Sequence, residues 1–140
     1  MNAPIYTPQI LRLAAELAAN HELERCDGRA ELRATTCGST VTTQVMIADD
    51  GTVAAISQSV RACAFGQAAA ALVERHAVGR SAPEVEQALG LLSGWLAGRS
   101  EDPGSWPGLD VLAPARTKTA RHGAILLPFR ALLAAIETAP

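Results

Sequence analysis

The stretch "ADDGTVAAISQSVRACAFGQAAAALVERHAVG", residues 48–79, contains both kinds of regular structure that we expect in this chain. Its Asp-Gly dipeptide is typical of a tight β-hairpin turn, so a strand is expected on each side of it. The second of these strands should end near Arg61. From Phe65 to Val73 the apolar residues recur at helical spacing, and a glycine follows that can end the helix. The stretch therefore predicts a strand that leads directly into a helix.

Two more strands are predicted before the Asp-Gly turn. Apolar and charged residues alternate over 29–34, which is typical of a strand with one buried face. In the next segment Val41, Val45 and Ile47 lie on one strand face. Together with the strand after the turn, these segments predict a meander of three antiparallel strands.

Helices are expected on both sides of this meander. Thr7 and Pro8 resemble a helix N-cap followed by a proline in the first turn, and that helix should end near Asn20. Ser81 is placed to cap a helix after the meander, and Pro128 is expected in the first turn of a terminal helix. The apolar stripes of these last two helices are Val85, Leu89, Leu92 and Leu96, then Phe129, Leu132, Leu133 and Ile136.

The order of elements predicts the fold class. Strands that come before most of the helices favour an α+β domain, here a three-stranded antiparallel sheet with about five helices packed on one side. The 140 residues fit a single domain, 1–140, that is large enough for a core without disulfides or metal.

Charge and composition exclude several classes of protein. The net charge of −2 makes nucleic acid an unexpected partner. No apolar run is long enough to span a membrane and the amino terminus lacks signal-peptide features, so we expect a cytoplasmic protein with no membrane partner. Three cysteines are too few and odd in number for a secreted disulfide framework. Each is then a buried hydrophobe, a metal ligand or a reactive thiol.

Two of the cysteines fall at the ends of predicted elements. Cys37 lies in the turn between the first two strands, and Cys63 stands where the third strand ends and a helix begins. A helix N-terminus presents free N–H groups and a partial positive charge, which stabilise a thiolate. The alternative is that Cys63 is simply a small buried hydrophobe beside Ala and Phe. Spacing alone does not decide between these, since no Cys-x-x-Cys pair is present.

Four segments resemble a known family. "TTCGST", "ADDGTV", "SVRACAFGQAAAALVERHAVGRS" and "ARHGAILLPFRALLAAI" occur in the order found in IscU/SufU-type iron–sulfur cluster assembly scaffolds, also called NifU-like (N-terminal) proteins. The resemblance spans roughly residues 5 to 138. It implies a SufE/NifU-like fold and a non-enzymatic role in which three cysteines and an aspartate hold zinc or a nascent cluster.

The resemblance carries only two of the four family ligands onto this chain. The family's Cys-Gly-Asp motif falls on Cys37, Gly38 and Ser39, so a serine replaces the aspartate, and the second cysteine falls on Cys63. The third cysteine falls on Ala124 or, with a shift of one residue, on Gly123. The chain is therefore degenerate in two of the four positions. It also lacks the family's Leu-Pro-Pro-Val-Lys chaperone-binding sequence.

His122 is the nearest residue that could replace the missing cysteine. An imidazole is a good ligand for zinc or iron, so the predicted site for metal or cluster is Cys37, Cys63 and His122. Alternatively, His122 only caps a backbone carbonyl. Cys26 lies in a loop where the family has no ligand, although a loop could still deliver a third thiolate. Arg116, Lys118 and Arg121 either line the rim of the site, where they would attract an acidic partner, or form a solvated basic face.

Three functions remain open on this basis. The first, which we favour, is a scaffold or carrier that receives iron and sulfur on Cys37 and Cys63. The second is a sulfur acceptor that takes persulfide from a cysteine desulfurase without building a cluster. The third is a degenerate module that binds partners without metal. By resemblance the partners are a cysteine desulfurase and iron–sulfur acceptor proteins, and the oligomeric state is either a monomer or a homodimer.

Overall fold

The Asp-Gly turn joins strands β2 (Thr40–Ile47) and β3 (Val53–Arg61) in a computed structural model that describes residues 6–35 and 38–140. Asp50 Oδ1 accepts hydrogen bonds from the Thr52 backbone N–H at 3.0 Å and from the Thr52 hydroxyl at 2.7 Å. β1 (Gly28–Arg33) pairs with the other edge of β2, so the strand order is β1-β2-β3 and both pairings are antiparallel. The predicted meander is confirmed.

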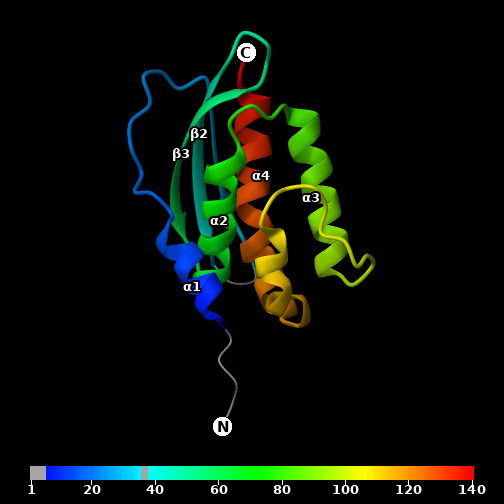
Figure 1. The fold of residues 1–140 in the computed structure, drawn as a ribbon. Helices are drawn as coiled ribbons and strands as arrows, with labels where there is room; N and C mark the ends of the chain where they lie inside the picture. The colour runs from blue at the N-terminus through cyan, green and yellow to red at the C-terminus, as the bar shows by residue number, and fades with distance from the viewer. Residues whose placement is uncertain (1–5, 36–37) are drawn as a thin grey trace.

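The helices flank the strands in the chain. They are α1 (Pro8–Ala15), α2 (Ala64–His76), α3 (Ala82–Leu96), the 3₁₀ helices η1 (Leu109–Thr117) and η2 (Thr119–Arg121), and α4 (His122–Thr138). Figure 1 shows α2 and α4 side by side on one face of the sheet, with α1 beside α2 and α3 beside α4. The predicted α+β fold with helices on one side of a three-stranded antiparallel sheet is therefore confirmed. None of the helices in the described ranges is long and apolar enough to cross a membrane.

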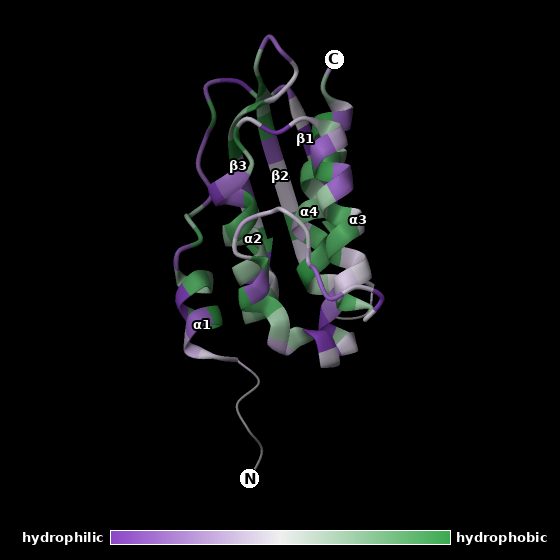
Figure 2. Ribbon diagram, turned by 45° about the vertical axis from the view of Figure 1, so that its right-hand side comes forward, coloured by the Kyte–Doolittle hydropathy of each residue, from purple (hydrophilic) through white to green (hydrophobic). Residues whose placement is uncertain are grey.

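The core lies between the sheet and the two central helices. Four side chains of this core are fully buried: Val41 and Val45 of β2, Phe65 of α2 and Phe129 of α4. Figure 2 shows hydrophobic residues along α2 and α4, whereas the tip of the β2–β3 hairpin is hydrophilic. The sheet therefore has one buried face and one face toward solvent.

Two of the predicted helix starts are confirmed by their caps. Thr7 accepts a hydrogen bond from the Ile10 backbone N–H, with Pro8 in the first turn of α1. Ser81 and Glu84 form a reciprocal capping box at the start of α3.

The first helix is shorter than predicted. α1 ends at Ala15 and not near Asn20. Beyond it, Glu16 forms an ion pair with Arg75 of α2, and the backbone N–H of Ala18 donates to Glu74 Oε2 at 2.9 Å. These contacts with α2 give the chain partners that a longer α1 would not have.

The last helix begins earlier than predicted. α4 starts at His122, so Pro128 lies inside the helix and not in its first turn. The residues from Ala124 to Leu127 are apolar and buried, which favours an additional turn and a half of helix against the core. Pro128 has no N–H, so the carbonyl of Ala124 loses its usual helical donor.

The loop after α3 is fixed to the core by Trp106. Its indole Nε1–H donates to the Leu72 carbonyl at 3.0 Å, and its ring meets that of Phe129 edge-on at 5.2 Å between centroids. Arg80 lies over the same ring. These contacts make Trp106 a packing residue of the core.

Two replacements of Trp106 should destabilise the fold by different amounts. Trp106→Phe removes the hydrogen bond and part of the ring, at a cost of about 1–3 kcal/mol, because the Leu72 carbonyl loses its donor. Trp106→Ala also removes the contact with Phe129 and should cost about 3–5 kcal/mol. Urea unfolding followed by circular dichroism measures both. A loss below about 1 kcal/mol for Trp106→Ala would show that the loop does not support the core.

Candidate functional site

Cys63 stands at the junction between β3 and α2. It is the N-cap residue of α2, with φ −66° and ψ 174°, and its side chain is half-buried and makes no capping hydrogen bond. Its thiol is not in a disulfide. The predicted placement of Cys63 where a strand ends and a helix begins is therefore correct. The thiol lies beside free N–H groups at the positive end of the helix dipole.

Tyr6 lies near this thiol. Its hydroxyl is close enough to Cys63, the Ala64 backbone N–H and the Arg121 charge for all three to act on its pKa. The Tyr6 ring meets Phe65 edge-on at 5.0 Å between centroids. Burial, followed by the nearby Cys63 thiol, raises the pKa of Tyr6 above its ordinary value. The sequence analysis did not identify Tyr6, because its only signal was a position just before the cap of α1.

The turn between β1 and β2 lies at the same end of the sheet as Cys63. The pairing places Arg33 beside Thr40, and Thr40 beside Arg61, two residues before Cys63. Cys37 itself lies outside the described residues, so its meeting with Cys63 stays a prediction.

The residues next to Cys37 hold this turn closed. The Gly38 backbone N–H donates to the Ala34 carbonyl at 3.0 Å, and the Ala34 N–H donates to the Ser39 carbonyl at 2.8 Å. Gly38 has φ +72°, a conformation that favours glycine. Ser39, which stands where the family has its aspartate, is 5% exposed. Ser39 is therefore a buried part of this turn.

The first turn of α4 lies against the first turn of α2. A Cβ added to Gly66 would lie 3.3 Å from the Cβ of Ala124 and 3.2 Å from its carbonyl oxygen. Ala124 is fully buried in this contact. Gly123 lines a pocket of about 480 Å³ between the end of β1 and α4. Both positions onto which the family's third cysteine falls are thus close to the end of the sheet that holds Cys63, but neither has a donor side chain.

The side chain of His122 lies on a different side of α4 from Ala124. Its Nε2 lies 2.8 Å from the Ala115 carbonyl, and it lines a second pocket with the end of α3, including Leu96 and Gly98. This contact assigns the proton to Nε2 and leaves Nδ1 with a lone pair. The capping role considered for His122 is therefore observed, while its role as a ligand is not tested by this geometry.

Cys26 lies at the opposite end of the sheet. It is exposed, and its thiol contacts the Gly28 carbonyl at 3.3 Å at the start of β1, beside Val45. Cys63 comes just after the row formed by Arg33 and Arg61, so it lies a strand length away from Cys26. Within residues 6–35 and 38–140, no group of three or more His, Cys, Asp or Glu side chains is arranged to hold a metal ion.

Comparison with solved structures shows what the chain is similar to. The crystal structure of a nitrogen-fixing NifU-like protein (N-terminal) from Brucella abortus is 30% identical, covers 96% of this chain and 93% of its own, and has a TM-score of 0.87. A putative iron–sulfur cluster assembly scaffold protein for the SUF system from Fervidobacterium islandicum AW-1 is 19% identical, with coverages of 94% and 96% and a TM-score of 0.80. No protein-family model and no curated protein matches the chain.

The environment of Tyr6 can be tested directly, because Tyr6 is the only tyrosine of the chain. Its phenolate should appear at a pH above the ordinary range for tyrosine, since burial and Cys63 both favour the neutral phenol. Cys63→Ala should lower the pKa part of the way back, because burial, the larger cause, remains. Ultraviolet difference absorbance against pH measures both, with Cys26→Ala as the control. An ordinary pKa that is the same in all three proteins would contradict the contact.

Proposed function

Because the chain belongs to the NifU-like (N-terminal) family, we propose that it acts in iron–sulfur cluster assembly as a scaffold or carrier that receives iron and sulfur on Cys37 and Cys63. The observation that carries this proposal is the half-buried thiol of Cys63 at the start of α2, at the sheet end that also holds the β1–β2 turn. The cluster is cargo in this role, so the chain needs no catalytic turnover of its own.

The donor atoms fit a soft metal but do not complete a four-ligand site. Thiolates suit zinc, iron and nascent clusters, and Cys37 and Cys63 supply two of them. Ser39 offers a neutral hydroxyl in place of a carboxylate, and Ala124 offers no donor. The proposal therefore needs at least one more ligand, and a water molecule, a second chain or a partner protein could supply the fourth.

His122 is the proposed third ligand. Its Nε2–H is engaged by the Ala115 carbonyl, and a hydrogen bond of this kind commonly orients an imidazole that binds metal through its other nitrogen. Binding at Nδ1 would require the imidazole to face Cys63 and not only the pocket beside α3. The same contact with Ala115 is also what a capping histidine would make, so the role has to be decided by measurement.

A sulfur-accepting role is the second candidate, and the two vacated ligand positions favour it. In this reaction a thiolate such as Cys63 attacks the outer sulfur of a persulfide on a cysteine desulfurase. A new S–S bond forms at Cys63, the S–S bond of the desulfurase breaks, and its cysteine leaves as a thiolate. This chemistry needs one accessible thiol and no metal ligands. It uses the same desulfurase partner and the same reducing, cytoplasmic setting that the sequence predicts.

Metal and sulfide content separates the candidate functions. After anaerobic reconstitution with ferrous iron, sulfide and thiol, a scaffold should retain iron and acid-labile sulfide in similar amounts, and Cys63→Ser should lose both. Cys26→Ser is the matched control and should retain them, because Cys26 lies at the far end of the sheet.

A second incubation, with a cysteine desulfurase and cysteine but no iron and no added thiol, supplies a persulfide donor. A persulfide on Cys63 there, without iron retention in the reconstitution, would select the sulfur acceptor. If neither a cluster nor a persulfide is found, both candidates are contradicted and the chain is a metal-free binding module.

Zinc titration tests His122. If His122 is a ligand, His122→Ala should weaken zinc binding about 100-fold or more, close to the effect of Cys63→Ala, because one coordinate bond is lost. His21→Ala, which changes an exposed histidine, should bind zinc like the wild type. Affinity should also fall as the pH is lowered, since protons compete for imidazole and thiolate lone pairs. Equal affinities for His122→Ala and the wild type would show that His122 caps the Ala115 carbonyl and does not bind the metal.

A further inference from the structure

Several exposed acidic residues and several unpaired arginines of the described chain lie at opposite ends of the molecule. Asp49 and Asp50 are exposed at the tip of the β2–β3 hairpin, and Glu137 is exposed in the last turn of α4, which lies at the same end in Figure 1. Arginines gather at the other end, where β3 leads into α2. A net charge of −2 conceals this separation.

Two of these arginines form a row on the solvent face of the sheet. Arg33 of β1 and Arg61 of β3 flank Thr40 of β2, and both are exposed. With Thr42, Ser59 and Glu31 they line a shallow depression of about 240 Å³. The outer strands of three neighbouring strands lie about 10 Å apart, so both guanidinium groups can reach one bound segment.

The single acidic residue of this depression is already engaged. Glu31 accepts a hydrogen bond from the Thr42 hydroxyl at 3.0 Å and lies 3.7 Å from a guanidinium nitrogen of Arg29. The ion pairs of the described residues use Arg25, Arg29, Arg75, Arg80 and Arg116. Within the described chain, Arg33 and Arg61 therefore have no carboxylate partner.

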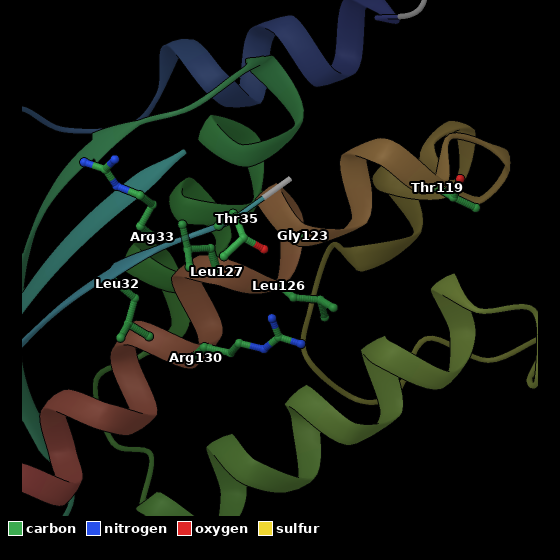
Figure 3. Close-up of a pocket in the computed structure, with 9 residues that line it drawn as sticks. Leu32, Arg33, Thr35, Thr119, Gly123, Leu126, Leu127 and Arg130 are labelled. Atoms are coloured by element: carbon green, nitrogen blue, oxygen red, sulfur yellow. The ribbon is translucent and has the colours of Figure 1, made fainter. Parts of the chain in front are cut away.

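Two more arginines continue the row around the edge of the sheet. Figure 3 shows Arg130 of α4 reaching past Leu126, while Arg33 points away from the leucines of the same pocket. The charge of Arg121 acts on the Tyr6 hydroxyl, which is itself near Cys63. No ion pair is formed by Arg121 or Arg130 within the residues that the structure describes. We call Arg33, Arg61, Arg121 and Arg130 the basic end.

Arg116 does not belong to the basic end. Its guanidinium donates to the carbonyls of Trp95 at 2.9 Å and Ser100 at 3.0 Å, and it pairs with Glu101. It is therefore a structural residue that fixes the loop after α3. Neither alternative given for Arg116, a rim of the site or a solvated basic face, describes these contacts.

We propose that the basic end docks an acidic segment of a partner protein beside Cys63. Guanidinium groups bind carboxylates in a planar, two-point geometry, and unpaired arginines lose no internal ion pair when they do so. The hydroxyls of Thr40 and Ser59 beside Arg33 and Arg61 supply further donors. The acidic hairpin end repels such a segment, so the charge separation also orients the encounter. A nucleic acid presents phosphates instead of carboxylates, and the titration below distinguishes the two.

The biological role of this surface rests on the proposed function, since it would bring a partner to the thiol that carries sulfur or iron. The docking itself does not depend on metal. It can therefore be measured with the metal-free, reduced protein, and its failure would leave the result of the iron and sulfide measurement unchanged.

A peptide titration tests the proposal. The probe is a fluorescein-labelled peptide of ten glutamates, and its anisotropy is followed at low ionic strength. Arg33→Gln/Arg61→Gln should weaken binding about tenfold or more, because it removes two of the four unpaired guanidinium groups. Arg12→Gln/Arg99→Gln is the matched control. It removes the same number of charges from exposed residues outside the basic end, in α1 and after α3, and it should bind within about twofold of the wild type.

The same experiment can overturn the proposal in two ways. Equal weakening by both double variants would show a general charge effect with no docking surface. Tighter binding of a single-stranded DNA of equal charge, with the same dependence on Arg33 and Arg61, would assign the basic end to phosphate polyanions. Circular dichroism of both variants should match the wild type, since all four arginines changed are exposed.

Discussion

The contact between the first turns of α2 and α4 is the constraint on which the candidate site depends. Gly66 makes it possible, since an added Cβ would lie 2.6 Å from the Ala62 Cβ and 3.2 Å from the Ala124 carbonyl. Pro128 has already deprived that carbonyl of a helical donor. Because the two helices begin side by side, the thiol of Cys63 and the guanidinium of Arg121 lie at one end of the sheet.

This geometry limits how the lost family ligands can be replaced. Ala124 faces α2 within the core, whereas His122 contacts Ala115 on the side of α3. A histidine two residues before Ala124 is therefore not equivalent to a cysteine there, because each step along a helix turns the side chain by about 100°. Under the proposed function, the third donor would approach Cys63 from a different direction.

The sequence predicted the elements whose signal is local. The Asp-Gly turn, the Thr7 and Ser81 caps and the change to helical spacing after Cys63 each act within a few residues, and the structure has them. The ends of α1 and α4 were wrong because contacts with distant residues decide them. Glu16 is drawn to α2, and burial of the segment around Ile125 extends α4 toward its start.

By itself the sequence determined the α+β class, the antiparallel meander and the position of Cys63 at a helix start, because periodicity and turn chemistry are properties of neighbouring residues. It also contained all the arginines, but not which of them remain without carboxylates. Only the tertiary structure decided that Tyr6 lies near Cys63, that His122 contacts Ala115, and that Arg33 and Arg61 share one row. These pairs are far apart in the chain or face directions set by packing, so no local pattern encodes them.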